Sequence, residues 1–431
     1  MTTRISQTDR DFEPRLAALL AAKREVAEDV AGSVRAIIRD VHARGDAALV
    51  EYTEKFDRLA LQPESLRISE ADRAVAGEAV EPAQRDALEF AAGRIEAFHR
   101  RQFPKDDRYT DAAGVDLGIR WTPLDSVGLY VPGGTASYPS SVLMNAIPAR
   151  VAGVPRIVMV TPTPDGHINP LVLLAAELGG VHEIYRVGGA QAVAALAHGT
   201  ETIAPVAKIM GPGNAYVAAA KREVFGTVGI DLIAGPSEVL VIADGDNDPD
   251  WIASDLLAQA EHDPAAQAIL VTDSAALADA VAAAVERQLK TLPRSSTALA
   301  SWRDFGAVIV VASLADAAGI ANRVAPEHLE LAVADPEALL PAIRNAGAVF
   351  LGRYTPEVIG DYVGGPNHVL PTARSARFSS GLSVLDFMKR TTLLKLGPEQ
   401  LRALAPSAIT LAEAEGLDAH ARSVAIRLNQ G

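Results

Sequence analysis

The chain has 431 residues, of which 49% are hydrophobic, 22% are charged and none is cysteine. At roughly 150 residues per domain, this length predicts about three domains, or two large ones with appendages. A sequence without cysteine excludes a disulfide scaffold, a cysteine-ligated zinc or iron–sulfur site and a thiolate nucleophile. The 40 Lys and Arg residues against 54 Asp and Glu residues leave a net charge of −14, which argues against a nucleic-acid partner.

Two stretches bear on targeting. Residues 1–16 carry charges throughout and contain no apolar segment, so they predict no signal peptide. The uncharged stretch 126–149 is interrupted by glycine and proline, so it cannot be a membrane-spanning helix. We therefore expect a cytoplasmic protein without a membrane partner.

The first quarter of the chain has a helical pattern. Hydrophobic residues recur at three- and four-residue steps over 12–57, with Gly45 as a stop signal. A second helix is predicted from Pro82 to about Arg101, because proline is favourable at the first helical position. Short alternating runs around Gly114, between about 108 and 122, predict a β-hairpin.

From Val127 onward, apolar strand candidates alternate with Ala-rich helix candidates. In the first series, strands at 127–131, 157–161 and 184–187 precede helices near 139–152, 170–179 and 190–197. In the second, strands at 238–243, 267–272, 306–312, 329–333 and 348–351 alternate with helices at 250–261, 274–290, 314–323 and 336–345. Such alternation is typical of βαβ units with a parallel sheet covered by helices.

The predicted fold class is therefore α/β, with two Rossmann-like, incomplete doubly wound units and helical appendages at both ends. The expected domains are an N-terminal helical appendage (1–24), a first α/β domain (25–126 with 237–381), a second α/β domain (127–236) and a C-terminal appendage (382–431).

Three turns rich in Gly and Pro follow predicted strands of the 127–236 unit. Ligands of open α/β sheets bind beyond the carboxyl ends of strands, where helix N-termini can meet phosphates. None of the turns has the G-x-G-x-x-G pattern. Each could be an ordinary βα turn, but three in succession favour a nucleotide-sized ligand. They are Pro132-Gly133-Gly134-Thr135, Gly188-Gly189-Ala190-Gln191 and Gly211-Pro212-Gly213-Asn214.

A possible metal site lies at the end of the helix predicted over 250–261. Gln259 and His262 are three residues apart, so they project from one helical face and can converge on one ion. An amide oxygen and an imidazole nitrogen would make half of a site for zinc or a similar divalent ion. The pattern is not H-E-x-x-H, which excludes the metalloprotease motif. The alternative is a solvated, polar helix end.

Other polar residues lie at strand entrances and in loops. Glu327 and His328 immediately precede an apolar strand, where they could act as acid and base or form a simple surface ion pair. The Gly-rich loop 360–371, with Asp361 and His368, is too long for a simple turn, and such loops more often bind a ligand. The role of His368 stays open. By themselves, Glu415 and His420 indicate only surface residues.

Several blocks spread along the chain resemble the signature of the histidinol dehydrogenase family. They occur in the family's order and cover essentially the whole chain. The blocks are Gly211-Pro212-Gly213-Asn214, the segment 229–238 (GIDLIAGPSE), Gln259-Ala260-Glu261-His262, Pro326-Glu327-His328, Gly360-Asp361-Tyr362, the segment 367–372 (NHVLPT), and 413–417 (EAEGL) with His420.

The resemblance implies oxidation of L-histidinol to L-histidine through L-histidinaldehyde, with reduction of two NAD⁺, as the last step of histidine biosynthesis. It implies a homodimer in which Glu415 and His420 enter the partner's site. It also implies one Zn²⁺ per subunit and a catalytic pair, Glu327 and His328. The implied zinc ligands are Gln259, His262, Asp361 and His420. Substrate would contact Ser237, Gln259, His262, His328, Asp361, Glu415 and His420, and NAD⁺ would contact Tyr130, Gln191 and Asn214.

The residue chemistry agrees with this reaction. An aldehyde can lose a second hydride only as an adduct, and a chain without cysteine must form that adduct with water. We expect His328 to remove the alcohol proton and to assist again in the second oxidation, and Glu327 to activate the water. Zinc would act as a template for the substrate's imidazole and amine. Two alternatives are a zinc hydrolase or lyase without a redox cofactor, and a relative that binds ligand without catalysis.

Overall fold

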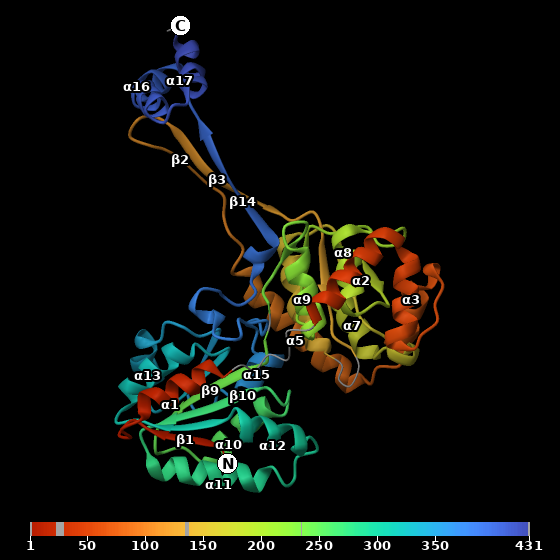
Figure 1. The fold of residues 1–431 in the computed structure, drawn as a ribbon, viewed down its shortest axis with the longest axis vertical. Coiled ribbons are helices and arrows are strands. Elements are labelled where there is room, and N and C mark those ends of the chain that lie inside the picture. Colours follow the sequence, from red (N-terminus) through yellow and green to blue (C-terminus); the bar gives the residue numbers. More distant parts are fainter. Residues whose placement is uncertain (1, 23–29, 134–137, 234, 430–431) are drawn as a thin grey trace.

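The computed structural model describes residues 2–22, 30–133, 138–233 and 235–429. Two α/β units lie side by side, and a long arm extends away from both (Figure 1). None of the helices in the described ranges is long and apolar enough to cross a lipid bilayer.

One unit is built on a six-stranded sheet in which all neighbouring strands are parallel. Both faces are covered, so the central strands are buried along their whole length, as expected for a parallel sheet. One face packs against α10, α11 and α12, and the other packs against α1 and α13. The strands, in sheet order, are β1 (Thr3–Ser6), β11 (Ala307–Val310), β10 (Gln267–Thr272), β9 (Glu238–Ala243), β12 (His328–Ala332) and β13 (Ala348–Leu351).

The other unit has a five-stranded parallel sheet. Its two faces contribute to two separate hydrophobic clusters, one with α5, α6 and α7 and one with α2, α3, α8 and α9. The strands, in sheet order, are β6 (Glu183–Tyr185), β5 (Ile157–Val160), β4 (Val127–Tyr130), β7 (Lys208–Met210) and β8 (Gly229–Ile230).

The arm is a three-stranded antiparallel sheet that ends in two helices. Strand β3 (Asp116–Pro123) pairs on one side with β2 (Asp107–Thr110) and on the other with β14 (Met388–Lys395). Helices α16 (Pro398–Ala414) and α17 (Asp418–Ala425) lie at its far end, together with the C-terminus (Figure 1).

The remaining helices have the following bounds: α1 (Phe12–Ala21), α2 (Val30–Arg44), α3 (Asp46–Asp57), α4 (Glu70–Glu78), α5 (Pro82–Arg100), α6 (Pro139–Ala152), α7 (Pro170–Gly179), α8 (Gly189–His198), α9 (Ala215–Val224), α10 (Pro249–Ala260), α11 (Ala275–Gln288), α12 (Ser295–Asp304), α13 (Leu314–Val324), α14 (Pro336–Leu339) and α15 (Glu357–Tyr362).

The structure confirms the predicted α/β class and most of the alternating elements. Strands β9, β10 and β13 and helices α6 and α7 have the predicted bounds, and the hairpin around Gly114 is β2–β3. Helix α14 is shorter than predicted and is followed by a 3₁₀ turn. Pro341 lies in this turn, and it lacks the N–H that would bond to the carbonyl oxygen of Glu337 in a longer α-helix. The short strands β1, β7 and β8 and helices α9, α12 and α15 carry too little periodic signal to be predicted.

Three segments pack differently from the expected domains. Residues 1–24 are predicted as a helical appendage, but β1 pairs with β11 as an edge strand of the six-stranded sheet. Helices α2 and α3, predicted with 237–381, cover the five-stranded sheet instead. The predicted C-terminal appendage is not wholly helical, because β14 completes the arm with β2 and β3. A hydrophobic helix face predicts that this face is buried, but it does not predict which sheet the helix packs against.

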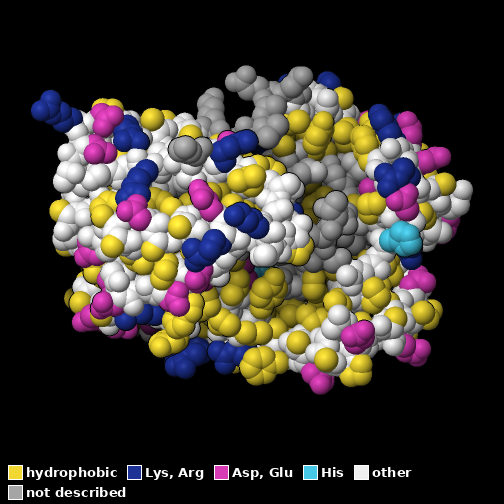
Figure 2. Space-filling view, turned by 90° about the horizontal axis from the view of Figure 1, so that it is seen from below, with side chains coloured by type: hydrophobic (Ala, Val, Ile, Leu, Met, Phe, Trp, Pro, Cys, Tyr) yellow, Lys and Arg dark blue, Asp and Glu magenta, His cyan; other side chains and the backbone are white. Residues whose placement is uncertain are grey.

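The surface carries both signs of charge. On the face drawn in Figure 2, the Lys and Arg side chains of the described residues are interspersed with Asp and Glu. The described residues on that face thus form no large patch of one sign of charge.

Candidate active site

A cleft of about 590 Å³ is lined by residues of both α/β units. This volume is in the usual range for small-molecule sites, and the boundary between two domains is a common place for them. Of the residues predicted from the sequence, the cleft walls include Asn214, Ser237, Gln259, His262, Glu327, His328 and Asp361.

Opposite edges of the two sheets contribute to this cleft. The turn after β7 lies at the carboxyl edge of the five-stranded sheet, as the general rule for parallel sheets predicts. In the six-stranded sheet, Ser237 precedes β9 and Glu327 precedes β12, so the residues there lie at the amino edge. The part of the cleft formed by the six-stranded unit therefore departs from the carboxyl-edge rule, and the part formed by the turn after β7 follows it.

His328 is the first residue of β12 and is 4% exposed. Its Nδ1 lies 3.0 Å from the carbonyl oxygen of Glu238 and 3.2 Å from Oε1 of Gln259. Both are acceptors, so Nδ1 carries the proton and Nε2 has the lone pair. Nε2 is buried without a hydrogen-bond partner in the described part of the chain, and it lies 3.8 Å from Oδ1 of Asp361. Burial lowers the pKa of His328 to about 4, so the imidazole is a neutral base at neutral pH.

Glu327 contacts the backbone of the same residue, Glu238. Its Oε2 accepts the backbone N–H of Glu238 at 3.0 Å and is 3.8 Å from Nδ1 of His328. Helix α13 ends at Val324. The next residue, Ala325, has a left-handed conformation (φ 48°), and the chain then turns through Pro326 into β12. This turn directs two adjacent side chains, a buried carboxyl and a buried imidazole, into one cleft.

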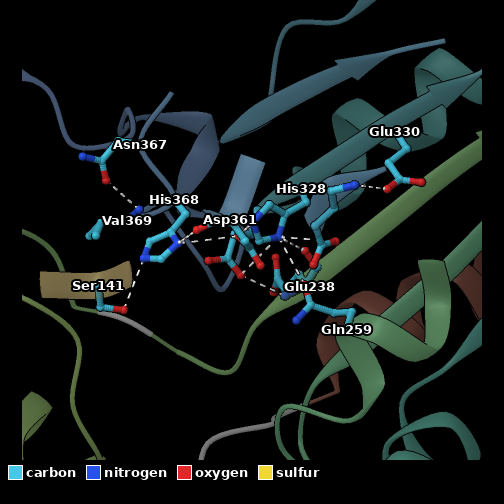
Figure 3. A network of polar contacts seen from close by, with 11 residues as sticks. Ser141, Glu238, Gln259, His328, Glu330, Asp361, Asn367, His368 and Val369 are labelled. Atoms are coloured by element: carbon cyan, nitrogen blue, oxygen red, sulfur yellow. Dashed lines mark hydrogen bonds and ion pairs between the residues drawn. The ribbon is translucent and has the colours of Figure 1, made fainter. Parts of the chain in front are cut away.

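The structure brings three of the four predicted zinc ligands to one wall of the cleft. Gln259 is buried near the end of α10, its Oε1 is next to His328, and its Nε2 has no hydrogen-bond partner among the described residues. Oδ1 of Asp361, on α15, lies 3.8 Å from Nε2 of His328 and 3.8 Å from Nδ1 of His368 (Figure 3). His262 follows α10 by two residues and is exposed to the cleft. These oxygen and nitrogen donors fit a zinc ion as a partial set.

The predicted fourth ligand is elsewhere. His420 is exposed on α17 at the far end of the arm, and Figure 1 shows α17 well separated from α10 and α15. Accordingly, no group of three or more His, Asp or Glu side chains in the described part of this one chain is arranged to hold a metal ion. Glu415, at the end of α16, is also exposed on the arm. Within one chain, the residues at 415 and 420 do not join the other predicted site residues.

His368, whose role the sequence leaves open, connects the loop after α15 to the second unit. Its Nδ1 is 2.9 Å from the carbonyl oxygen of Asp361, and its Nε2 is 3.2 Å from the hydroxyl of Ser141 on α6 (Figure 3). Asn367 donates to the carbonyl oxygen of Met144 at 2.6 Å. The loop thus holds Asp361 in place across the domain boundary. Sequence reasoning missed Ser141, because a serine in an apolar helix carries no signal of its own.

A cluster of three carboxyl groups begins next to His328, and none of the three lines the cleft. Glu357 is 2% exposed, and its Oε2 lies 3.8 Å from Nδ1 of His328. Burial, reinforced by the charge of Asp361, raises the pKa of Glu357 well above its usual value and favours the neutral acid. Glu330 accepts the backbone N–H of Glu357 at 2.6 Å, and burial also raises its pKa. Burial raises the pKa of the neighbouring Asp255 to about 6. The sequence gives no sign of this cluster, because its members are dispersed in apolar segments.

The residues predicted to contact NAD⁺ have different surroundings. Asn214 lines the cleft, and its Oδ1 accepts the backbone N–H groups of Tyr216 and Val217 at the start of α9. Tyr130 is buried, its hydroxyl accepts the N–H of Gly189 at 3.0 Å, and burial raises its pKa to about 12. Gln191 is also buried, on α8. Their contacts with NAD⁺ stay a prediction. Residues 134 and 135 of the first Gly-rich turn lie outside the described residues.

Comparisons with known proteins give one consistent result. A sequence model of histidinol dehydrogenase matches residues 20–428. Histidinol dehydrogenase of Rhizobium meliloti (strain 1021) is 71% identical over 431 residues, covering 100% of this chain and 99% of that protein. The one from Mesorhizobium japonicum is 70% identical over 429 residues, covering all of both chains. The crystal structure of histidinol dehydrogenase from Elizabethkingia anophelis has a TM-score of 0.95 at 38% identity, covering 99% of this chain and 98% of that one. The chain therefore belongs to the histidinol dehydrogenase family.

Proposed function

We propose that this chain oxidises L-histidinol to L-histidine through L-histidinaldehyde, with reduction of two NAD⁺, in the cytoplasm as the last step of histidine biosynthesis. The observation that carries the proposal is the pairing of two adjacent buried groups at the cleft. They are a neutral imidazole with a proton-free Nε2 at His328 and the carboxyl group of Glu327. This pair supplies a base for a hydroxyl proton and a second group for water.

In the first oxidation, His328 removes the proton of the substrate hydroxyl through Nε2. The hydrogen bond from Nδ1 to the Glu238 carbonyl fixes the ring and the tautomer, so the lone pair points to the cleft side where Asp361 lies. The C–H hydride leaves as the C–O double bond forms, and the aldehyde stays in the site. Because His328 is buried, competing water is excluded from Nε2, the nitrogen that accepts the proton.

In the second oxidation, Glu327 removes a proton from water as the water oxygen bonds to the aldehyde carbon. Protonated His328 returns the proton from the first step to the aldehyde oxygen, which forms the hydrate and leaves the imidazole neutral. The resulting hydrate loses its remaining C–H hydride while His328 accepts a hydroxyl proton again, which yields the acid. The N–H of Glu238 orients the Glu327 carboxylate, so both bases are anchored to one residue, Glu238. When bound, zinc would hold the substrate's imidazole and amine as a template, and each NAD⁺ would accept one hydride.

Gln259, His262 and Asp361 would hold one zinc ion per subunit, with His420 of a second copy as the fourth ligand. Ser237 and Glu415 would contact the substrate, and Tyr130, Gln191 and Asn214 would serve the NAD⁺ side. The proposal of a homodimer is supported by the arm, whose terminal helices carry Glu415 and His420 away from the cleft of their own chain. It is also supported by three exposed leucines there, Leu404 and Leu411 on α16 and Leu417 immediately before α17.

The stoichiometry of the reaction tests the proposed function. We expect purified protein to form two NADH per L-histidinol consumed, with L-histidine as the product. Absorbance at the NADH band and chromatography of the products would measure both. Formation of no NADH with histidinol, in the presence of zinc, would refute the proposal and favour a hydrolase, a lyase or a ligand-binding protein.

Removal of the metal should separate activity from folding. The proposed ligands lie at a cleft wall, and the two large units have their own hydrophobic cores, so the fold does not depend on the ion. We expect chelation to abolish NADH formation while leaving the circular dichroism spectrum nearly unchanged, and added zinc to restore the rate. Unfolding upon chelation would instead indicate a structural metal site.

A further inference from the structure

One buried ion pair lies directly beneath the cleft turn that carries Asn214. Nζ of Lys221, on α9, forms a short contact with Oδ1 of Asp231, and their side chains are only 3% and 2% exposed. Lys221 also donates to the carbonyl oxygens of Gly211 at 3.0 Å and of Leu232 at 2.9 Å. A fully desolvated pair with this many hydrogen bonds has a defined geometry, and it contributes specificity more readily than stability.

The ion pair forms hydrogen bonds with both backbone polar groups of Gly211. Oδ2 of Asp231 accepts the N–H of Gly211 at 2.7 Å, while Lys221 binds the carbonyl oxygen of the same residue. Gly211 has a φ of +104°, and a Cβ there would approach the carbonyl oxygen of Tyr130 to 2.2 Å. The chain can therefore leave β7 and enter the turn 211–214 in this direction only when residue 211 is glycine and both its polar groups are satisfied.

The pair also connects two walls of the cleft. Gly211 follows β7 and Asp231 follows β8, and these neighbouring parallel strands end together. Both the turn 211–214 and residues 231–232 line the cleft. Asp231 and Leu232 begin the connection that leads to β9 and to Ser237 in the six-stranded unit.

We infer that Lys221 and Asp231 are positioning residues for the dinucleotide. They set the turn 211–214 so that its backbone and Asn214 can receive NAD⁺. This inference rests on the proposed function and extends it to residues that the proposed mechanism does not use. Apart from the two residues on the arm, the side chains proposed to bind substrate and zinc belong to the six-stranded unit or its loops. The ion pair belongs to the five-stranded unit, so its loss should weaken NAD⁺ binding much more than histidinol binding.

The decisive variant is Lys221→Met combined with Asp231→Leu. Replacing a buried ion pair with apolar residues of similar size commonly leaves stability unchanged or improves it. The same exchange leaves Gly211 without its donor and its acceptor. Because a small misplacement of a binding group is costly, we expect the Kd of NAD⁺ from calorimetry to rise roughly tenfold or more. The KM of histidinol at saturating NAD⁺ should stay close to that of the parent protein. The thermal midpoint should fall, because the exchange leaves both backbone polar groups of Gly211 without these partners.

Two further variants keep the test informative. Asp231→Asn retains the shape but only one acceptor oxygen, so it should weaken NAD⁺ binding even if the double variant fails to fold. Lys208→Met is the matched control, because Lys208 in β7 donates to the carbonyl oxygen of Asp386 at 2.7 Å and does not line the cleft. It should leave the Kd of NAD⁺ unchanged.

The possible results are distinguishable. Unchanged NAD⁺ affinity in a folded double variant, or in Asp231→Asn, would overturn the inference and leave the pair a purely structural role. An equal loss of NAD⁺ affinity in Lys208→Met would also overturn it. If the parent protein itself binds no NAD⁺, the proposed function fails, which is a separate result from failure of the variants.

Discussion

Replacement of Glu327 by glutamine is expected to slow formation of histidine far more than formation of histidinaldehyde. Glutamine keeps the shape of the side chain and an oxygen that can accept the N–H of Glu238, but it cannot take a proton from water. Loss of one general base typically lowers a rate by roughly 10²- to 10⁴-fold. We expect a loss of that size with histidinaldehyde as the substrate, whereas alcohol oxidation, monitored with an aldehyde trap, should fall much less.

The comparison variant is His328→Gln. Because His328 accepts a proton in both oxidations, this change should slow the alcohol and aldehyde reactions together. Circular dichroism would show that each variant is folded, and a measurement of metal content would show that it contains zinc. Equal losses of both reactions in Glu327→Gln would contradict the assignment of the carboxylate to water activation, while a selective loss of aldehyde oxidation in His328→Gln would contradict the assignment of the imidazole.

A dimer made from two inactive subunits is expected to regain about half of the parent activity. One subunit carries His262→Ala and the other carries His420→Ala, with different affinity tags so that the mixed dimer can be purified. If each arm completes the partner's site, both lesions fall in one site and the second site is intact. Each homodimer of a single variant should be nearly inactive, because every site then lacks a proposed zinc ligand.

A matched pair controls for nonspecific recovery. A mixed dimer of His420→Ala with Glu415→Ala places one lesion in each site, because both residues lie on the arm. It should therefore regain no activity. An inactive His262→Ala and His420→Ala mixed dimer would contradict arm exchange, and so would a parent protein that is active as a monomer.

The arrangement of the two sheets has a consequence for the chemistry. The amino edge of the six-stranded sheet presents His328 and Glu327, while the carboxyl edge of the five-stranded sheet presents the turn 211–214. The groups that we propose for substrate oxidation and for dinucleotide binding thus enter one cleft from different units. The His368 bridge between Asp361 and Ser141 joins the same two units.

The local elements were largely predictable, because the periodicity of apolar residues is a local property. The strand at 238–243 is a continuous apolar run, and the helix at 139–152 begins with Pro139 and ends before Gly153, so both bounds follow from nearby residues. The strand at 388–395 was missed, because its residues are mostly exposed and alternate weakly, and it is a strand only through pairing with β3.

The sequence by itself determined the α/β class, most strand positions and the candidates Gln259, His262, Glu327, His328 and Asp361, because these depend on local patterns and short motifs. Only the tertiary structure decided which sheet the N-terminal segments cover, which tautomer His328 adopts, and that Lys221 and Asp231 enclose Gly211. The tertiary structure also decided that α17, which contains His420, lies at the end of a long arm, away from the cleft of the same chain. The physical reason is that burial, hydrogen-bond partners and distances between remote segments arise only when the chain has packed.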